Sequence, residues 1–308
     1  MPTTLGQNQY GKAETRVVRV TREGGTHHLR DLNVSVALSG AMDEVHLSGS
    51  NAAVLPTDTM KNTVLAFAKE HGVASAEDFG ILLARHFVTG RASVHRARVR
   101  VEEYAWRRIP AGGDGGDGGS GGDGGGHSFV RAGGETRTAE VAFDGERCQV
   151  VSGLTGLVVL NSTDSEFWGF ERDAYTTLQE TRDRILATEV TARWRYAWSG
   201  ASPEAPRWDE AWARARGDLL AAFAGTYSYS LQQTLYAMGA RVVENSSGDA
   251  AIDEVRLSLP NKHHFLADLA PFGLANDGEV YIAADRPYGL IEGTVLREGA
   301  EARIPVTD

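Results

Sequence analysis

Apolar and polar residues alternate in two stretches near the start of the chain, residues 16–22 and 29–38, with a Gly-Gly pair at residues 24–25 between them. Alternation with a period of two is typical of a strand that buries one face. In the second stretch the apolar residues of one face are Leu32, Val34, Val36 and Leu38. The pattern therefore predicts two strands joined by a turn.

The apolar period then changes to that of a helix. Residues 57–71 place Met60, Val64, Leu65 and Ala68 at helical spacing, and Gly72 follows as a stop signal. A second helix should begin at Ser75, which forms a capping box with Asp78. Alternation returns at residues 92–106 and 136–143. The first half of the chain therefore has the predicted order ββααββ.

The second half repeats this order. Strands are predicted at residues 149–160, 188–198, 252–259, 280–284 and 288–296, and helices at residues 208–223 and 228–242. An additional segment, residues 164–186, is rich in turn residues and has a partly helical pattern. The chain therefore indicates an α+β fold built from a duplicated ββααββ unit, in which each antiparallel sheet carries two helices on one face. Such sheets have open edges, which favour oligomerisation.

Glycine is concentrated in one place. Of the 36 glycines in the 308 residues, eleven lie between Gly112 and Gly126. Such a segment typically forms a flexible linker, and we expect a flexible insertion at residues 111–127 inside a hairpin of the first domain. The expected domains are residues 1–146 and 147–308.

Charge and composition exclude several classes of partner. The chain has 31 Lys+Arg against 41 Asp+Glu, a net charge of −10, which disfavours nucleic-acid binding. No apolar run is long enough to span a membrane, and the polar N-terminus does not resemble a signal peptide. Cys148 is the one cysteine, as is usual in a reducing compartment. We therefore expect a cytoplasmic protein with no nucleic-acid or membrane partner.

Two histidine pairs are the strongest candidates for a metal site, at residues 27–28 and 263–264. Neighbouring residues of a strand point to opposite faces, so neither pair can chelate one ion as it stands. No phosphate-binding or dinucleotide-binding loop lies at a strand-to-helix junction. We expect neither a metal nor a cofactor.

Four short strings are specific when taken together: Tyr10-Gly-Lys-Ala13, Thr57-Asp-Thr-Met-Lys-Asn-Thr63, Phe167-Trp-Gly-Phe170 and Leu259-Pro-Asn-Lys-His263. The chain resembles the urate oxidase (uricase) family through them, from Tyr10 to about Leu296. The resemblance implies two tandem T-fold (tunnelling-fold) domains and a homotetramer with active sites at subunit interfaces. It also implies cofactor-independent oxidation of urate by O2 and water, in purine degradation, to 5-hydroxyisourate and hydrogen peroxide.

The resemblance also assigns site residues. The implied catalytic residues are Lys12, Thr57 and His263. The implied substrate contacts are Thr57, Asp58, Phe167, Leu178, Arg184, Leu231, Gln232 and Asn261. Leu231 stands where the family often has valine, which should be harmless if the backbone amide makes the contact. The chain departs from the family in the glycine block, and it ends without the peroxisomal Ser-Lys-Leu tripeptide of eukaryotic members.

The assigned residue types suit urate, which is flat, polar and anionic. The Arg184 guanidinium offers a planar pair of donors, the Gln232 amide both donates and accepts, and the Phe167 ring can stack on a purine. Taken singly, each residue has an ordinary structural interpretation; Thr57, for example, looks like a helix N-cap. Two other functions stay open. One is a T-fold enzyme acting on a different pterin or purine, and the other is a non-catalytic paralogue.

Overall fold

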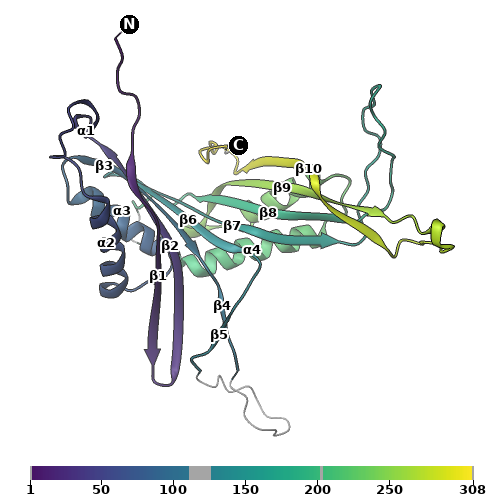
Figure 1. Cartoon of the computed structure of the whole chain (residues 1–308), viewed down its shortest axis with the longest axis horizontal. Coiled ribbons are helices and arrows are strands. Elements are labelled where there is room, and N and C mark those ends of the chain that lie inside the picture. The colour runs from purple at the N-terminus through teal and green to yellow at the C-terminus, as the bar shows by residue number, and fades with distance from the viewer. Residues whose placement is uncertain (1, 111–125, 202–203, 307–308) are drawn as a thin grey trace. The chain divides into compact units, whose positions relative to one another are not determined.

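A computed structural model describes residues 2–110, 126–201 and 204–306 of the chain. Its residues fall into two compact units (Figure 1). Unit 1 comprises Met1–Ser152 and Trp198–Trp208, and unit 2 comprises Gly153–Ala197 and Asp209–Asp308. The division at residue 146 stays a prediction. Residues 111–125 of the predicted glycine-rich insertion lie outside the described residues.

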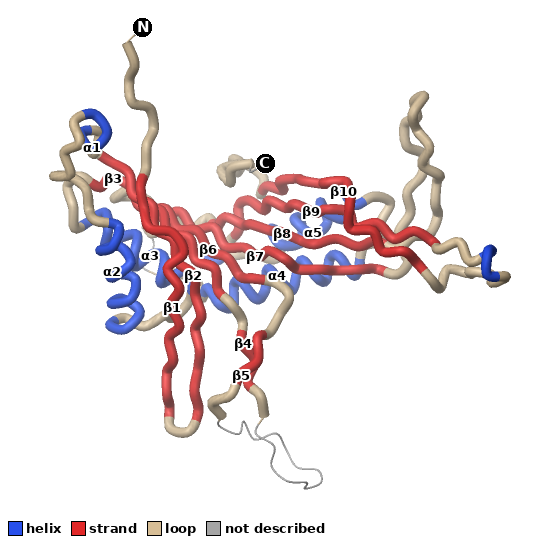
Figure 2. The backbone as a smooth tube through the Cα atoms, in the orientation of Figure 1, coloured by secondary structure: helices blue, strands red, loops and turns tan. Residues whose placement is uncertain are grey.

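Unit 1 is an antiparallel sheet with helices on one face (Figure 2). Its strands pair in the order β1-β2-β3-β6. Their bounds are Tyr10–Glu23 for β1, Thr26–Gly40 for β2, Val94–Glu103 for β3 and Thr136–Phe143 for β6, and β7 (Cys148–Asn161) begins in this unit. The helices are α1 (Glu44–Leu47), α2 (Thr57–Glu70) and α3 (Ala76–Thr89), and a separate pair is β4 (Trp106–Arg108) with β5 (Phe129–Arg131).

The core of unit 1 follows the apolar pattern of the sequence. Leu32, Val34, Val36 and Leu38 of β2 are all buried, as predicted. On α2 the buried residues are Met60, Val64 and Ala68, whereas Leu65 is 44% exposed. The predicted cap of α3 is confirmed, because the Ser75 hydroxyl accepts a hydrogen bond from the Asp78 amide at 3.0 Å. Alternation and capping were therefore sufficient to locate these elements.

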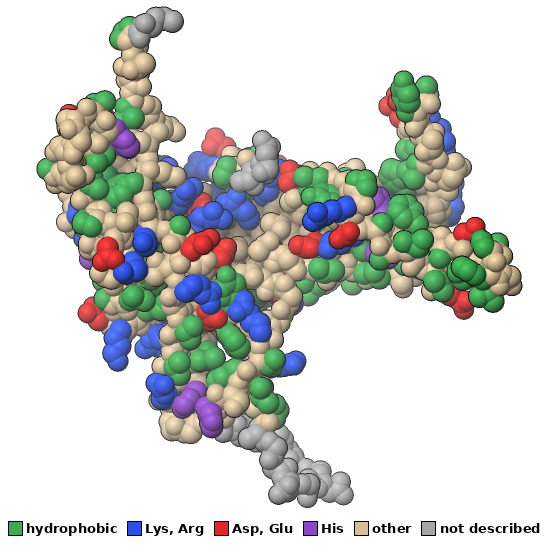
Figure 3. Space-filling view, viewed as in Figure 1, with side chains coloured by type: hydrophobic (Ala, Val, Ile, Leu, Met, Phe, Trp, Pro, Cys, Tyr) green, Lys and Arg blue, Asp and Glu red, His purple; other side chains and the backbone are tan. Residues whose placement is uncertain are grey.

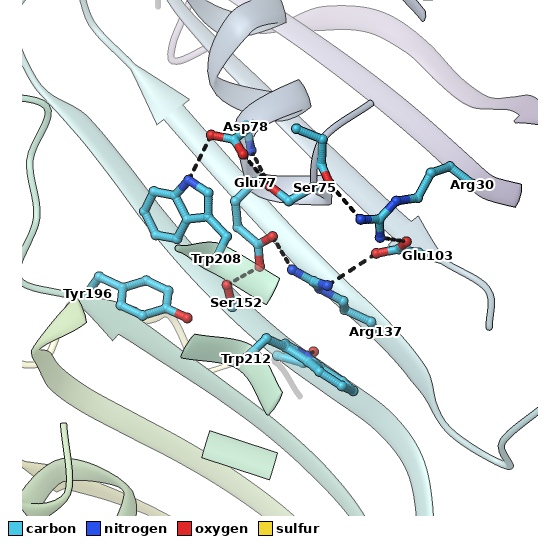
Figure 4. A network of polar contacts seen from close by, with 12 residues as sticks. Arg30, Ser75, Glu77, Asp78, Glu103, Arg137, Ser152, Tyr196, Trp208 and Trp212 are labelled. Atoms are coloured by element: carbon cyan, nitrogen blue, oxygen red, sulfur yellow. Dashed lines mark hydrogen bonds and ion pairs between the residues drawn. The ribbon is translucent and has the colours of Figure 1, made fainter. Parts of the chain in front are cut away.

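A buried polar network fastens α3 to the sheet of unit 1 (Figure 4). The Glu77 carboxylate is fully buried, accepts a hydrogen bond from Arg137 of β6 at 2.5 Å and another from the Ser152 hydroxyl of β7. Arg137 also pairs with Glu103, which in turn accepts from Arg30 at 2.6 Å. Removing one partner of a buried ion pair is strongly destabilising. This network therefore holds α3 at one position on the sheet.

Unit 2 has the same plan. Its strands pair in the order β7-β8-β9-β10, with β8 at Leu186–Tyr196, β9 at Ile252–Leu266 and β10 at Tyr281–Leu296. Its helices are α4 (Trp208–Gly225) and α5 (Leu231–Glu244), and the short 3-10 turns are η1 (Gly248–Ala250) and η2 (Ala270–Phe272). The Trp212 indole of α4 donates to the Gly153 carbonyl of β7 at 2.8 Å. Both units are therefore antiparallel sheets with helices on one face, which confirms the predicted α+β, T-fold class.

Two expectations differ from the structure, and one pair of strands has bounds that no pattern predicts. The segment at residues 164–186 contains no helix, because its backbone is held by strand-like bridges at Ser165 and Phe167 instead. The strands predicted at residues 280–284 and 288–296 form one strand, β10, whose pairing with β9 is irregular between them. The β4–β5 pair was expected only as part of a hairpin, without its bounds.

Candidate functional site

Lys12 lies on β1 beside a break in the strand. It pairs with the buried residue Val36 of β2, and the register then shifts between Lys12 and Thr15. Within this β-bulge Glu14 has a φ of 58°, and its amide donates to the Ser35 hydroxyl at 3.0 Å. Bulges bend a strand and redirect its side chains. Lys12 therefore lies beside an interruption in the regular pairing. It is half-buried, and its place opposite the buried Val36 puts it on the face that carries the helices.

The start of α2 is tied to the same strand. The Tyr10 hydroxyl accepts a hydrogen bond from the Leu55 amide at 2.9 Å, just before the helix begins. Pro56 occupies the N-cap position and Thr57 is the first helical residue, so the interpretation of Thr57 as a helix N-cap is wrong. Among the described residues, the exposed Thr57 hydroxyl has no hydrogen-bond partner. The hydroxyl is free to bind a ligand.

Asp58 links the helix start to Lys12 electrostatically. Its pKa is lowered, first by the hydrogen bond and charge of Lys61, then by the Asn62 amide at 2.9 Å and by the charge of Lys12. Thr57 and Asp58 begin α2, and the Leu55 amide just before them is bonded to Tyr10, two residues from Lys12 on β1. Lys12, Thr57 and Asp58 are called here the lysine group of unit 1. A cavity of about 400 Å³ is lined by Lys12, Glu14 and Arg100, and neither Thr57 nor Asp58 lines it.

Phe167 is held by its backbone in unit 2. Its amide and carbonyl both bond to Thr181, at 2.9 and 3.0 Å, and the neighbouring Glu166 amide donates to the Ser228 carbonyl at 2.7 Å. The Phe170 ring stacks on it with a centroid distance of 5.1 Å. A ring on a backbone fixed in this way is a rigid surface for stacking.

Arg184 lies just before β8 with its guanidinium 5.3 Å from the centre of the Phe167 ring. Its Nε donates to the hydroxyl of Ser165 at 3.1 Å, and burial lowers the pKa of the guanidinium. Arginine stays charged at neutral pH even when its pKa falls. A positively charged, planar guanidinium group therefore lies beside an aromatic ring. This combination suits a flat anion, which can accept hydrogen bonds from the one and stack on the other.

The start of α5 belongs to the same region. The bridge between Ser165 and Ser228 brings the Phe167 segment beside the residues that precede this helix. Ser230 is the N-cap, and its side chain accepts from the Gln233 amide at 3.2 Å. The amides of Leu231 and Gln232 occupy the first turn, where no helical carbonyl is available to them. The Leu231 side chain is buried and the Gln232 side chain is exposed, so only the latter can turn toward a ligand.

Asn261 and His263 continue the buried face of β9. Leu257 and Leu259 fill this face in the core, and period-two alternation puts Asn261 and His263 on the same side. Both are half-buried. The pKa of His263 is lowered by burial first and then by the charge of Arg184, so the imidazole is neutral at pH 7. The register of β8 and β9, in which Ala187 pairs with Lys262, also brings the start of β8 beside His263, and Arg184 lies just before that start.

Most of the predicted site residues are thus brought together in two clusters, one in each unit. The second, called here the arginine group, comprises Phe167, Arg184, Leu231, Gln232, Asn261 and His263. Leu178 is the exception, because it lies farther along the segment that carries Phe167 and is 54% exposed. Sequence reasoning missed Tyr10 and Ser165 as supports of the site. Tyr10 lies two residues from Lys12 in the sequence, and this spacing could have indicated that it supports the site. The sequence gives no comparable indication for Ser165.

Two further observations concern other site classes. Among the described residues, no cluster of three or more His, Cys, Asp or Glu side chains is arranged to hold a metal ion. No helix in this part of the chain is both long enough and apolar enough to cross a membrane.

Comparison with known proteins identifies relatives over almost the full length. The model of the uricase family matches residues 8–142 and 150–292. A uricase of Arthrobacter globiformis is 49% identical over 302 residues, which cover 98% of this chain and 93% of the relative. A uricase of Danio rerio is 35% identical over 310 residues, covering 97% of this chain and 98% of the relative.

Solved structures agree with these matches. The crystal structure of the Arthrobacter globiformis uricase has a TM-score of 0.89 at 49% identity and covers 99% of each chain. A uricase structure from Bacillus fastidious has a TM-score of 0.75 at 22% identity, covering 95% of this chain and 94% of the other. The latter likeness concerns the fold alone.

Proposed function

The chain belongs to the uricase family, and we propose that it is a urate oxidase, an oxidoreductase that converts urate, O2 and water to 5-hydroxyisourate and hydrogen peroxide without a cofactor. The observation that carries the proposal is the arginine group. The Arg184 guanidinium lies 5.3 Å from the centre of the Phe167 ring and acts electrostatically on His263. Family membership indicates the reaction, and this geometry supplies the chemistry it needs.

Urate binds to the arginine group by shape and charge. Its flat ring stacks on Phe167, and Arg184 donates two parallel hydrogen bonds to one edge. Gln232 pairs with the opposite edge, and the free amide of Leu231 adds a donor at the positive end of α5. Holding the purine in one orientation is a large part of what an enzyme of this kind must do. Leu178 is proposed as a packing contact for the bound ligand.

The lysine group supplies proton transfer. Lys12 takes a proton from urate through the Thr57 hydroxyl, and the resulting dianion gives electrons to O2 held beside Thr57 and Asn261. A bond forms between O2 and C5 of the purine, giving a peroxide at that carbon. Water then replaces the peroxide at C5, and the proton that Lys12 took from urate returns through Thr57 to the departing hydroperoxide, which leaves as hydrogen peroxide. His263, which is neutral, orients this relay. The product is 5-hydroxyisourate, and the two electrons lost by urate reduce O2 to hydrogen peroxide.

The two groups meet at an interface between copies of the chain. In this proposal the lysine group of one copy faces the arginine group of another, within a homotetramer. Among the described strands, β1 pairs on one side with β2, and β10 pairs on one side with β9. Long open edges of this kind need a partner.

Exposed apolar residues support the same proposal. Figure 3 shows hydrophobic side chains on the surface at the end of the β9–β10 pair. Phe265, Leu266, Phe272 and Ile282 are each more than half exposed in this region. Apolar patches of this size typically mark protein interfaces. The reaction belongs to purine degradation, and we place it in the cytoplasm, where a lone buried cysteine such as Cys148 stays reduced.

The direct test is oxidation of urate by the purified full-length protein. Loss of urate absorbance in the ultraviolet, with matching oxygen uptake, is expected in chelator-treated buffer with no added metal or cofactor. Absence of both signals would overturn the proposed activity. A different pterin or purine consumed in place of urate would support another T-fold enzyme, and no consumption at all would support a non-catalytic protein.

A further inference from the structure

Thr188 of β8 has a side chain that the fold leaves unsatisfied. The residue is fully buried, and its hydroxyl oxygen has no hydrogen-bond partner among the described residues. A buried polar group without a partner destabilises a protein, and native proteins keep few of them. Thr188 lies on the buried face of its strand with Val190 and Ala192. An apolar residue at this position would fit the pattern of that face better.

The position of Thr188 relative to the arginine group suggests a use for the hydroxyl. Thr188 is the direct cross-strand partner of Asn261 in the antiparallel pair of β8 and β9. Directly opposed side chains point to the same face, with Cβ atoms about 4.5–5.5 Å apart. The Asn261 carboxamide also has no hydrogen-bond partner among the described residues. Two polar groups without partners therefore face each other beside the proposed oxygen site.

The other neighbour of Asn261 leaves room for its side chain to move. Gly289 of β10 pairs with Asn261, and a Cβ added to it would meet no atom within 4 Å. Between Ala284 and Gly289 the strand departs from regular pairing, which opens the sheet beside Asn261. A change of rotamer at Asn261 can therefore bring its carboxamide within reach of the Thr188 hydroxyl.

We propose that Thr188 is a positioning residue that orients Asn261 in the loaded site. A carboxamide presents an acceptor at one end and two donors at the other. The Thr188 hydroxyl donates to Asn261 Oδ1, so that the Nδ2 donors point at O2 and at the peroxide that forms from it. Donors aimed at developing negative charge lower the barrier of such a step. This inference rests on the proposed urate oxidase activity.

Thr188→Val tests the inference because it keeps the side-chain shape and removes the hydroxyl. We expect kcat/KM for oxygen to fall about 10- to 100-fold, the range seen when outer groups that orient a site are removed. Binding of xanthine, a purine that lacks the C8 oxygen of urate, should be unchanged. The melting temperature should stay the same or rise, because an unsatisfied buried group is removed. Thr188→Ser, which keeps the hydroxyl, should retain near-wild-type oxygen kinetics.

A matched control and a double mutant separate positioning from packing. Thr191→Val alters the other face of β8, where the Thr191 hydroxyl lies 3.1 Å from that of Thr155, and should leave oxygen kinetics unchanged. In an Asn261→Ala background, Thr188→Val should have no additional effect, because the residue through which it acts is absent. Wild-type oxygen kinetics in Thr188→Val, or an undiminished effect in the double mutant, would overturn the inference. Failure of the wild-type protein to oxidise urate would instead overturn the proposed function.

Discussion

At the scale of single residues, the strands around the candidate catalytic side chains are irregular beside them. β1 bulges next to Lys12, and β10 loses its regular pairing beside Asn261 and His263. A regular strand would keep each side chain in line with its buried neighbours, whereas a bulge changes its direction. The proposed roles of these side chains therefore depend on local departures from the pattern that specifies the sheet.

Lys12→Met is the first residue-scale prediction. The substitution removes the ammonium group and keeps an unbranched side chain. If Lys12 accepts the proton of urate, kcat should fall at least about 100-fold, as expected for loss of a general base. Xanthine should still bind, because the stacking and clamping residues belong to the arginine group.

Lys69→Met, at an exposed position near the end of α2, is the matched control and should behave as wild type. Turnover close to wild type in Lys12→Met would contradict the proton relay.

His263 gives a prediction about pH. Burial and the charge of Arg184 lower its pKa below the ordinary value of 6.5. Arg184→Gln removes a positive charge that disfavours the imidazolium ion, so the pKa should rise. The titration midpoint of the His263 ring can be followed by NMR of the labelled side chain, with His263→Gln used to assign the signal.

The lowered pKa of His263 also predicts how the stability of the folded protein changes with pH. Because the folded state binds the proton of His263 less tightly than the unfolded state, the contribution of His263 to stability is present above about pH 6.5 and is lost as the pH falls through the folded-state value. Arg184→Gln should weaken this dependence, whereas Arg182→Gln, at a residue that pairs with Glu166 and lies over the Trp168 ring, should leave it unchanged. An unaltered midpoint in Arg184→Gln would contradict the placement of the two side chains.

At the scale of elements, each group forms where a helix begins above the sheet. Thr57 and Asp58 start α2, Leu231 and Gln232 start α5, and both helix starts present free backbone donors to an anion. The existence of these helices and of most strands could be predicted, because apolar periodicity reflects burial of one face. The bulges and the bridged segment at residues 164–186 could not, because they depend on contacts between distant parts of the chain.

The close packing of α5 on β10 gives an element-scale prediction. A Cβ added to Gly239 would lie 2.6 Å from a methyl carbon of Val295. Gly239→Ala should therefore lower the melting temperature, since overpacking costs about 1–3 kcal/mol and opposes the gain of about 1 kcal/mol that alanine brings to a helix. Gly217→Ala in α4 is the control, because its Cβ would meet nothing within 4 Å. It should raise the melting temperature. Equal shifts in both variants would show that the helix does not need this close approach.

At the scale of the whole molecule, the two units carry different parts of the proposed chemistry. The lysine group can transfer a proton but offers no aromatic surface, and the arginine group can hold a purine but has no candidate base other than His263. The residues of the site could be named from the sequence only because their motifs occur together, since each one alone has an ordinary structural interpretation. Their division between two clusters became visible in the structure, because separation along the chain does not determine which residues meet.

Mixing two inactive variants tests whether a site draws on two copies. Lys12→Met keeps an intact arginine group, and Arg184→Gln keeps an intact lysine group. If each site joins the groups of two copies, oligomers that contain both variants regain some sites with both groups intact, about one quarter of all sites for random equal mixing. Activity should therefore appear when the two proteins are dissociated together and reassembled, and each variant treated alone should stay inactive.

A mixture of Lys12→Met with Thr57→Ala is the matched control, because both changes lie in the lysine group and no arrangement of copies restores it. If reassembled oligomers contain both variants and show no gain in activity, the site lies within one chain, whereas a gain shows that the enzyme works only as an assembly.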